Sequence, residues 1–343
     1  MTSAGIAAEN YPFCTIEPNS GVVPVPDARL AKLDEIVHSA RVVPATVEFV
    51  DIAGLVRGAS QGEGLGNQFL AHIRETAAIL HVVRCFEDAD VVHVEGGVDP
   101  LRDVETIETE LVLADLDTVA RRLERVRRAA RGGRKEDQAE AEFFEALSAH
   151  LSQGKPARTF PAPAAQADNL RESFLLSAKP VLYVANVDEA GLTAGNEAVA
   201  ALERYAEKTG AGVVRISARI ESVLGELEPD EKQAFLADLG LEEPGLHRLI
   251  RAVYALLELV SYFTAGEKEV KAWTIRRGTL APQAAGVIHT DFERTFIRAE
   301  VIPYDDYVAC GGEAGARAAG KLRVEGREYV MRDGDVVHFR VGA

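Results

Sequence analysis

Apolar segments that end in a polar residue set the strongest limit on how this chain can fold. Residues 42–51 are rich in β-branched side chains and end in Asp51, and Gly54 follows soon after. Residues 78–83 and 180–185 are further apolar segments, with helical patterns between them. The alternation predicts buried strands of a doubly wound α/β sheet, whose ligands bind at the carboxyl ends of the strands.

A long amphipathic stretch separates the second and third of these strands. Residues 103–131 carry apolar side chains near helical spacing, and Gly132 and Gly133 end the pattern. Residues 136–151 form a second expected helix. Together they predict an antiparallel α-helical hairpin inserted into the sheet domain.

Beyond an expected helix at 245–260, the chain changes to short β runs of a separate α+β domain. These runs are 271–275, 296–301, 328–331 and 336–341. Asp333 and Gly334 are expected at the tip of a hairpin turn between the last two runs. The predicted boundaries are 1–102 and 169–256 for the two parts of the sheet domain, 103–168 for the hairpin and 257–341 for the last domain.

Composition excludes several classes of function. The 343 residues carry a net charge of −16, which argues against wholesale binding to DNA. No apolar run is long enough to cross a bilayer, and the three cysteines are far apart and lack metal-ligand spacing. We therefore expect a cytoplasmic protein with reduced thiols and no membrane partner.

Asp51 and Gly54 stand where a P-loop nucleotidase places two phosphate-sensing residues. The carboxylate there holds a magnesium-bound water, and the glycine N–H meets the γ-phosphate. A plain strand followed by a glycine turn fits the same residues about equally well. Upstream, Thr15 is a candidate to offer its hydroxyl to magnesium and its N–H to the γ-phosphate, with a surface turn at Pro12 as the alternative.

A base-reading signal follows the strand predicted at 181–185. Guanine-specific proteins use Asn-Lys-x-Asp, in which the carboxylate accepts hydrogen bonds from the base. Here Asn186 is followed by Val187 in place of the lysine and Glu189 in place of the aspartate. We expect guanine selectivity to fail and adenine to be admitted. Ser217 and Ala218 follow the strand predicted at 212–216, where the last base-contacting loop would lie.

A basic run marks the tip of the expected hairpin. Residues 121–135 hold eight basic side chains and one acidic side chain, Glu124. This concentration predicts non-specific contacts with RNA backbone phosphates, and a solvated face with i,i+4 ion pairs is the alternative. The candidate RNA contacts are Arg121, Arg122, Arg125, Arg128 and Arg131.

Taken in this order, the motifs resemble those of the YchF or Obg-like ATPase family over essentially the whole chain. The stretches that carry the resemblance are Tyr11–Asn19, Phe49–Leu55, Gly62–Asn67, His81–Glu87 and Asn186–Glu189. The resemblance implies a P-loop NTPase-type sheet and a C-terminal ubiquitin-like β-grasp domain of the TGS type. It also implies hydrolysis of ATP, and of GTP less well, with Mg²⁺, and association with the ribosome.

The resemblance also assigns roles to residues that local patterns do not single out. Leu55 stands where many GTPases carry a water-orienting glutamine, and its hydrocarbon side chain cannot do this. The resemblance gives the water to His93, which local sequence alone would favour as a structural histidine. Cys14 lies in the first-switch segment of a family often described as redox-regulated, with an inert thiol as the default interpretation.

A Walker A pattern, Gly-x4-Gly-Lys-Ser/Thr, does not precede the first-switch segment in these 343 residues. The near match at 315–321 is followed by Leu322, which cannot bind magnesium, and we interpret it as a decoy. Two hypotheses follow. The chain is an Obg-like ATPase whose start codon is placed too far downstream or whose gene is truncated, or it is a ribosome-binding interaction protein that hydrolyses nothing.

Overall fold

The computed structural model describes residues 19–52, 65–88 and 97–342. The described residues form two compact units, of which one contains residues 19–21, 50–52, 65–88 and 97–248 and the other contains residues 22–49 and 249–342. Residues 22–49 were assigned from the sequence to the sheet domain, whereas their contacts place them with the C-terminal unit. The parallel pairing of Val42 with Val270 is one of those contacts.

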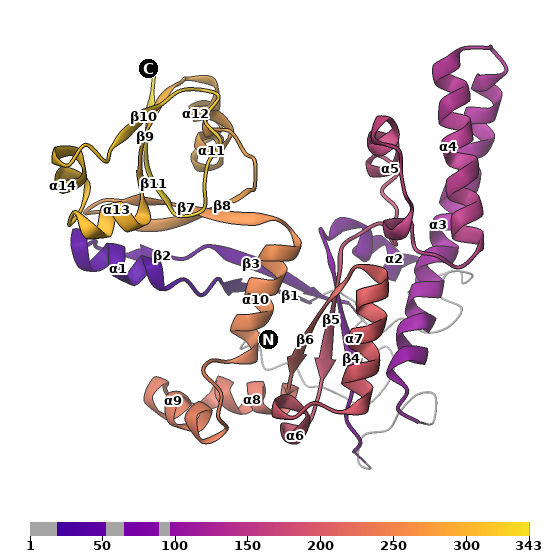
Figure 1. Cartoon of the computed structure of the whole chain (residues 1–343), viewed down its shortest axis with the longest axis horizontal. Coiled ribbons are helices and arrows are strands. Elements are labelled where there is room, and N and C mark those ends of the chain that lie inside the picture. Colours follow the sequence, from indigo (N-terminus) through magenta and orange to yellow (C-terminus); the bar gives the residue numbers. More distant parts are fainter. Residues whose placement is uncertain (1–18, 53–64, 89–96, 343) are drawn as a thin grey trace. The chain divides into compact units, whose positions relative to one another are not determined.

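A three-stranded parallel sheet lies at the centre of the first unit (Figure 1). Its strands are β4 (Ile79–Arg84), β5 (Val181–Asn186) and β6 (Gly212–Ile216), in the order β4-β5-β6. The first five residues of β5 are buried, as the apolar run predicts. Among the described strands, β4 pairs with β5 alone, and Val82 on β4 is 56% exposed.

The predicted buried strand at 42–51 is wrong. The structure divides it into β2 (Val42–Val43) and β3 (Thr46–Asp51), with Pro44 and Ala45 between them. Proline has no N–H to donate to a ladder, which explains the break. Strand β3 pairs with β1 (Asn19–Pro24) in a separate two-stranded sheet, and it alternates between exposed and half-buried residues over its first four positions. Polar Thr46 and Glu48 supply its exposed face.

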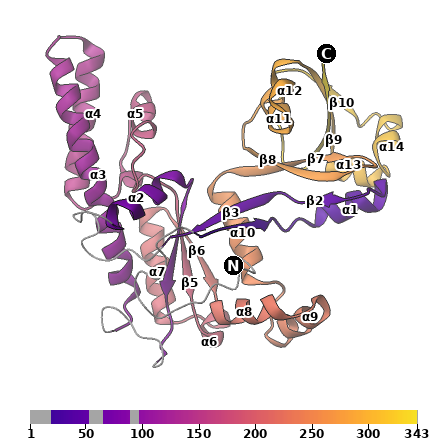
Figure 2. The ribbon, with the colours of Figure 1, turned by 180° about the vertical axis from the view of Figure 1, so that it is seen from behind.

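The helical hairpin is confirmed, and both views show its two helices side by side (Figures 1 and 2). Helix α3 (Pro100–Ala130) begins after Asp99, whose side chain accepts a hydrogen bond from the Arg102 N–H. Gly133, with φ of 80°, allows the turn into α4 (Lys135–Ser152). Buried side chains between the two helices form a core of their own, which includes Val119, Leu123, Val126, Phe144 and Leu147.

Shorter helices complete the first unit. They are α2 (Leu65–Glu75), α5 (Ala167–Arg171), α6 (Glu189–Thr193), α7 (Glu197–Thr209), α8 (Ala218–Glu226), α9 (Pro229–Asp238) and the start of α10 (Gly245–Leu256), with 3₁₀ turns η1 (Ala157–Thr159) and η2 (Ala164–Gln166). Val199 and Leu202 of α7 pack with Tyr183 of β5 and with Val104 of α3 in one buried cluster. The root of the hairpin therefore shares a core with the central strand of the sheet.

The second unit is built on a mixed six-stranded sheet in the order β10-β9-β11-β7-β8-β2. Its other strands are β7 (Leu259–Ala265), β8 (Val270–Arg276), β9 (Phe296–Pro303), β10 (Arg323–Glu325) and β11 (Asp335–Val341). Its helices are α1 (Ala28–Val37), α11 (Ala281–Ile288), α12 (Thr290–Arg294), α13 (Tyr304–Ala309) and α14 (Glu313–Ala318). No helix of the described residues is long and apolar enough to cross a membrane.

Two sequence predictions for this unit are wrong. Residues 328–331 form no strand, and their only β contact is an isolated bridge between Val330 and Leu280. The expected hairpin at Asp333 is therefore absent, and β11 pairs instead with β9 and β7. The reason is that the turn carboxylates bind backbone N–H groups: Asp333 accepts from Ser261 at 2.8 Å and Asp335 from Arg332 at 2.9 Å.

Candidate functional site

Asn186, Ser217 and Ala218 come together at the carboxyl ends of β5 and β6. The side-chain oxygen of Asn186 accepts a hydrogen bond from the Ala218 N–H at 3.0 Å. Ser217 is 2% exposed and caps α8 by accepting from the Ile220 N–H. The two predicted base-contacting loops are thus joined directly, at the edge where a parallel sheet binds its ligands.

Asp188 and Glu189 have different tasks in the tetrad that begins with Asn186. The Asp188 carboxylate accepts from the Gly191 N–H at 2.7 Å and so caps α6. A Cβ on Gly191 would lie 2.9 Å from Asp188 Oδ1, so this tight cap requires glycine. Glu189 is exposed and has no hydrogen-bond or ion-pair partner within the described residues. Its carboxylate is therefore available to a ligand.

Val187, which takes the place of the lysine in the base-reading tetrad, is buried. Its side chain is 2% exposed and belongs to the buried cluster of the sheet. Its N–H bonds to the Ile216 carbonyl at 2.9 Å, which continues the ladder between β5 and β6. The geometry leaves Val187 a packing role, and a base would meet no aliphatic stem from this position.

The remaining nucleotide-site candidates are placed only in part. Asp51 is the last residue of β3, and its side chain is exposed. Thr15, Cys14, Gly54 and His93 lie outside the described residues. Within residues 19–52, 65–88 and 97–342, no group of three His, Cys, Asp or Glu side chains is arranged to hold a metal ion.

The near match to a phosphate loop at 315–321 is a packed helix, as expected of a decoy. Most of it lies in α14, which follows α13 rather than a strand. A Cβ on Gly315 would lie 1.9 Å from the Cys310 carbonyl oxygen, so glycine is needed there for close packing. Lys321 pairs with Asp306 at 3.1 Å.

The basic tip of the hairpin has more acidic partners than the sequence indicated. Four of its arginines form ion pairs, and the structure joins Arg121 to Asp117, Arg122 to Glu140, Arg127 to Glu145 and Arg128 to Glu124. The expectation that this face lacks acidic partners is wrong: Asp117 and Glu124 lie on α3 itself, and α4, which runs antiparallel to α3, brings Glu140 and Glu145 alongside. The solvated-face alternative with i,i+4 pairs explains Arg121 and Arg128, whose partners are exposed and lie on the same helix.

Two groups of basic residues can therefore be distinguished at the tip. Arg122 lies with its guanidinium 4.6 Å from the centre of the Phe144 ring and also bonds to Ser173, so its role is structural. Arg125, Arg131, Arg134 and Lys135 are exposed and form no ion pair within the described part of the chain. These last four, called the free tip cations below, are the side chains that remain available to phosphate.

Sequence reasoning missed three buried carboxylates on α3, which are Glu108, Glu110 and Asp115. Glu108 accepts hydrogen bonds from the hydroxyls of Tyr183 and Tyr205 and pairs with Arg158 of η1. Burial and the bond to Glu108 both raise the pKa of the Tyr183 hydroxyl. One carboxylate thus ties the root of the hairpin to β5, α7 and η1.

Asp115 lies seven positions farther along the same helix and is 1% exposed. It accepts from the N–H groups of Leu176 and Ser177, each at 2.7 Å, and from the Ser177 hydroxyl at 2.6 Å. Burial raises the pKa of Asp115, although its hydrogen bonds oppose that shift. A detectable signal existed in the sequence, because Glu108 and Asp115 interrupt the apolar face at helical spacing.

The described cysteines show no sign of a reactive site. Cys85 is 1% exposed, and burial raises the pKa of its thiol to about 11. Cys310 is half-buried, and both thiols are free. A thiol held protonated at neutral pH is a poor nucleophile, so Cys85 is interpreted as a core residue.

Comparison with known proteins identifies the family. Residues 1–119 match the family model described as a 50S ribosome-binding GTPase, and residues 259–342 match the YchF-GTPase C-terminal family, described as a protein of unknown function. The ribosome-binding ATPase YchF of Haemophilus influenzae is 55% identical over 340 residues, which cover 99% of this chain and 93% of that protein. This chain belongs to the YchF family.

Other YchF relatives agree over the same length. The ribosome-binding ATPase YchF of Bacillus subtilis is 53% identical and the Obg-like ATPase 1 of Rattus norvegicus 42% identical, each over 99% of this chain, and 93% and 87% of those proteins are covered. The solved structure of the Schizosaccharomyces pombe YchF GTPase matches with a TM-score of 0.85 and 38% identity, over 96% of this chain and 90% of that one. The predicted fold class, a P-loop GTPase-type α/β domain with a YchF-type C-terminal domain, is confirmed.

Proposed function

We propose that this chain is a nucleotide-dependent switch protein that binds ATP, and GTP less well, with Mg²⁺ and associates with the ribosome. The names of its YchF relatives, ribosome-binding ATPase and Obg-like ATPase, support this function. The observation that carries it furthest is the hydrogen bond from Ala218 to Asn186, with the free carboxylate of Glu189 three positions after Asn186. These are the parts of a base-reading edge.

The preference for adenine rests on Glu189 and on the burial of Val187. A glutamate carboxylate stands one methylene farther from the backbone than an aspartate, so it does not take up the two-point contact that guanine needs. Val187 is 2% exposed and offers no stem along the base. Both features weaken guanine binding more than adenine binding.

Magnesium is proposed for the phosphate side of the site. Mg²⁺ prefers oxygen ligands and keeps several waters, and the exposed carboxylate of Asp51 is suited to hold it through one of them. The Thr15 hydroxyl is the second proposed oxygen donor. When bound, the ion would neutralise charge on the phosphates. Gly54 would offer its N–H to the γ-phosphate, and His93 would orient the attacking water.

Ribosome association is assigned to the free tip cations Arg125, Arg131, Arg134 and Lys135. Four unpaired cations at the end of a long hairpin suit the phosphate backbone of RNA, which binds basic side chains without reading sequence.

Nucleotide binding by the 343-residue polypeptide tests the proposal. We expect ATP to bind more tightly than GTP, because Glu189 and the buried Val187 weaken guanine binding more than adenine binding. Saturation-transfer NMR with ATP and GTP should show stronger signals for the adenine than for the guanine protons.

Glu189→Asp should lower the ratio of the ATP signal to the GTP signal. Glu197→Asp, a change at an exposed position in α7, should leave this ratio unaltered. Equal or tighter binding of GTP would contradict the expected preference for adenine. An unchanged ratio in Glu189→Asp would remove Glu189 from the base site.

A further inference from the structure

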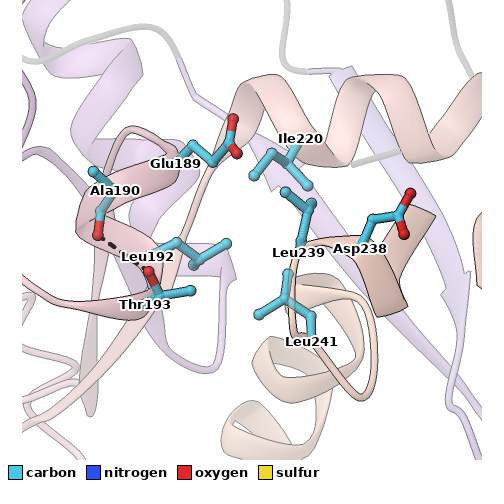
Figure 3. Close-up of a pocket in the computed structure, with 8 residues that line it drawn as sticks. All are labelled: Glu189, Ala190, Leu192, Thr193, Ile220, Asp238, Leu239 and Leu241. Carbon is cyan, nitrogen blue, oxygen red and sulfur yellow. Dashed lines mark hydrogen bonds between the residues drawn. The ribbon is translucent and has the colours of Figure 1, made fainter. Parts of the chain in front are cut away.

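A cavity of about 370 Å³ opens between α6, α8, α9 and the turn that follows α9 (Figure 3). Leu192, Ile220, Leu239 and Leu241 converge on it. Leu192 is 8% and Ile220 6% exposed, whereas Leu239 and Leu241 are half-buried, so the floor is apolar and partly open to solvent. A cavity of this size and lining is near the lower end of the range for ligand-binding pockets.

Carboxylates flank this apolar floor. Glu189 and Asp238 line the cavity, both are exposed, and neither has a hydrogen-bond or ion-pair partner among the residues that the structure describes. Thr193 completes the lining, with its hydroxyl bonded back to the Ala190 carbonyl at 3.4 Å. The polar groups left for an occupant are therefore acceptors that carry negative charge.

The surrounding lobe, residues 218–243, contains more acidic residues than its own hydrogen bonds and helix caps use. It contains eight acidic and two basic residues. Glu221 accepts from the N–H groups of Gly245 and Leu246, and Glu228 and Glu231 form the capping box of α9, so these three have structural tasks. The exposed acidic residues without a partner in the described chain are Glu226, Asp230, Asp238 and Glu242.

We propose that this pocket and its rim, called the acidic pocket below, bind a short basic segment of a partner protein. A leucine-like side chain of that segment fills the space among Leu192, Ile220, Leu239 and Leu241, and a flanking lysine or arginine contacts Asp238. An apolar anchor in a pocket supplies affinity, and charge complementarity supplies orientation and fast association. Nucleic acid is disfavoured here because the rim carries negative charge, as the phosphate backbone does.

Fluorescence anisotropy with a labelled synthetic peptide tests the proposal on the full 343-residue chain. The probe has two leucines four positions apart, flanked by lysines, and two control peptides replace either the leucines by serines or the lysines by glutamates. We expect saturable binding of the probe, and a loss of about tenfold or more with each control peptide. No nucleotide is added, so failure of this proposal leaves the proposed nucleotide site untouched.

Protein variants distinguish the pocket from general attraction to acidic surface. Thr193→Trp places a large side chain in the cavity from an exposed position and should lower the affinity for the probe peptide by about tenfold. Ala194→Trp changes an exposed residue outside the lining and should leave the affinity unchanged. Asp238→Lys should weaken binding about as much, and Glu226→Lys, a like change on α8 away from the lining, should weaken it less.

Any of three results would overturn the proposal that the acidic pocket binds a basic segment: no saturable binding of the probe, equal binding of the serine peptide, or unchanged affinity in both Thr193→Trp and Asp238→Lys. Melting curves of each variant confirm that the fold is kept.

Discussion

Glu108→Ala is expected to lower the free energy of unfolding by about 3–5 kcal/mol, because it leaves a buried charge without its partner. Arg158 has a side chain only 10% exposed, and its Nε and Nη1 atoms have no partner among the described residues, so Glu108 is its one counter-ion. The hydroxyls of Tyr183 and Tyr205 lose an acceptor at the same time. Chemical unfolding followed by circular dichroism measures the loss.

Two further variants make this prediction specific. Glu105→Ala removes an exposed carboxylate from the same helix and should change stability by about 0.5 kcal/mol or less. Glu108→Gln keeps an acceptor for the tyrosines but leaves the Arg158 charge unpaired, so its effect should lie between the other two. If Glu108→Ala proved as mild as Glu105→Ala, the buried network would not stabilise the root of the hairpin.

Asp115→Ala is expected to cost about 3 kcal/mol or more, since each buried donor left unsatisfied costs about 1–3 kcal/mol. Three donors depend on Asp115: the N–H groups of Leu176 and Ser177 and the Ser177 hydroxyl. Thermal and denaturant unfolding should both show the loss.

Asp117→Ala is the matched control, because Asp117 is 70% exposed and its pair with Arg121 is a surface i,i+4 contact worth about 0.5 kcal/mol or less. Equal stability of the two variants would mean that solvent reaches the Asp115 site and satisfies its donors.

The hairpin and the central sheet could be predicted from the sequence because their local signals agree with the tertiary structure. Apolar residues at helical spacing and a glycine pair defined α3 and α4 to within a few residues. The run at 212–216 coincides with β6, and the run at 180–185 differs from β5 by one residue at each end. Periodicity and glycine breaks are local properties, so one sequence is enough to read them.

Other features could not be predicted because long-range partners decide them. The strand at 42–51 is broken at Pro44, and β2 pairs with β8, more than two hundred residues away. Residues 328–331 have strand propensity, but Tyr329 donates its hydroxyl to Asp335 and the segment stays irregular. The partners of Arg122 and Arg127 come from α4, which a count along α3 cannot include.

The candidate site also contains both kinds of feature, those that the sequence predicts and those that it does not. The position of Asn186, Ser217 and Ala218 at one edge follows from two parallel strands, and the structure bears it out. The burial of Val187 and the capping role of Asp188 depend on where α6 begins, which the tetrad alone does not reveal. Contacts of Thr15, Gly54 and His93 remain predictions.

Ribosome binding by the free tip cations tests the account most directly. The double variant Arg131→Gln/Arg134→Gln removes two unpaired cations, and its matched control, Arg121→Gln/Arg128→Gln, removes two cations that are paired with Asp117 and Glu124. Co-sedimentation with ribosomes over a range of salt concentrations compares the two. We expect the first variant to bind about tenfold more weakly, with a salt slope reduced by about one to two, and the control to stay near the unmodified chain. Equal affinity of both variants and the unmodified chain, or an equal loss in both, would contradict docking through the free tip cations.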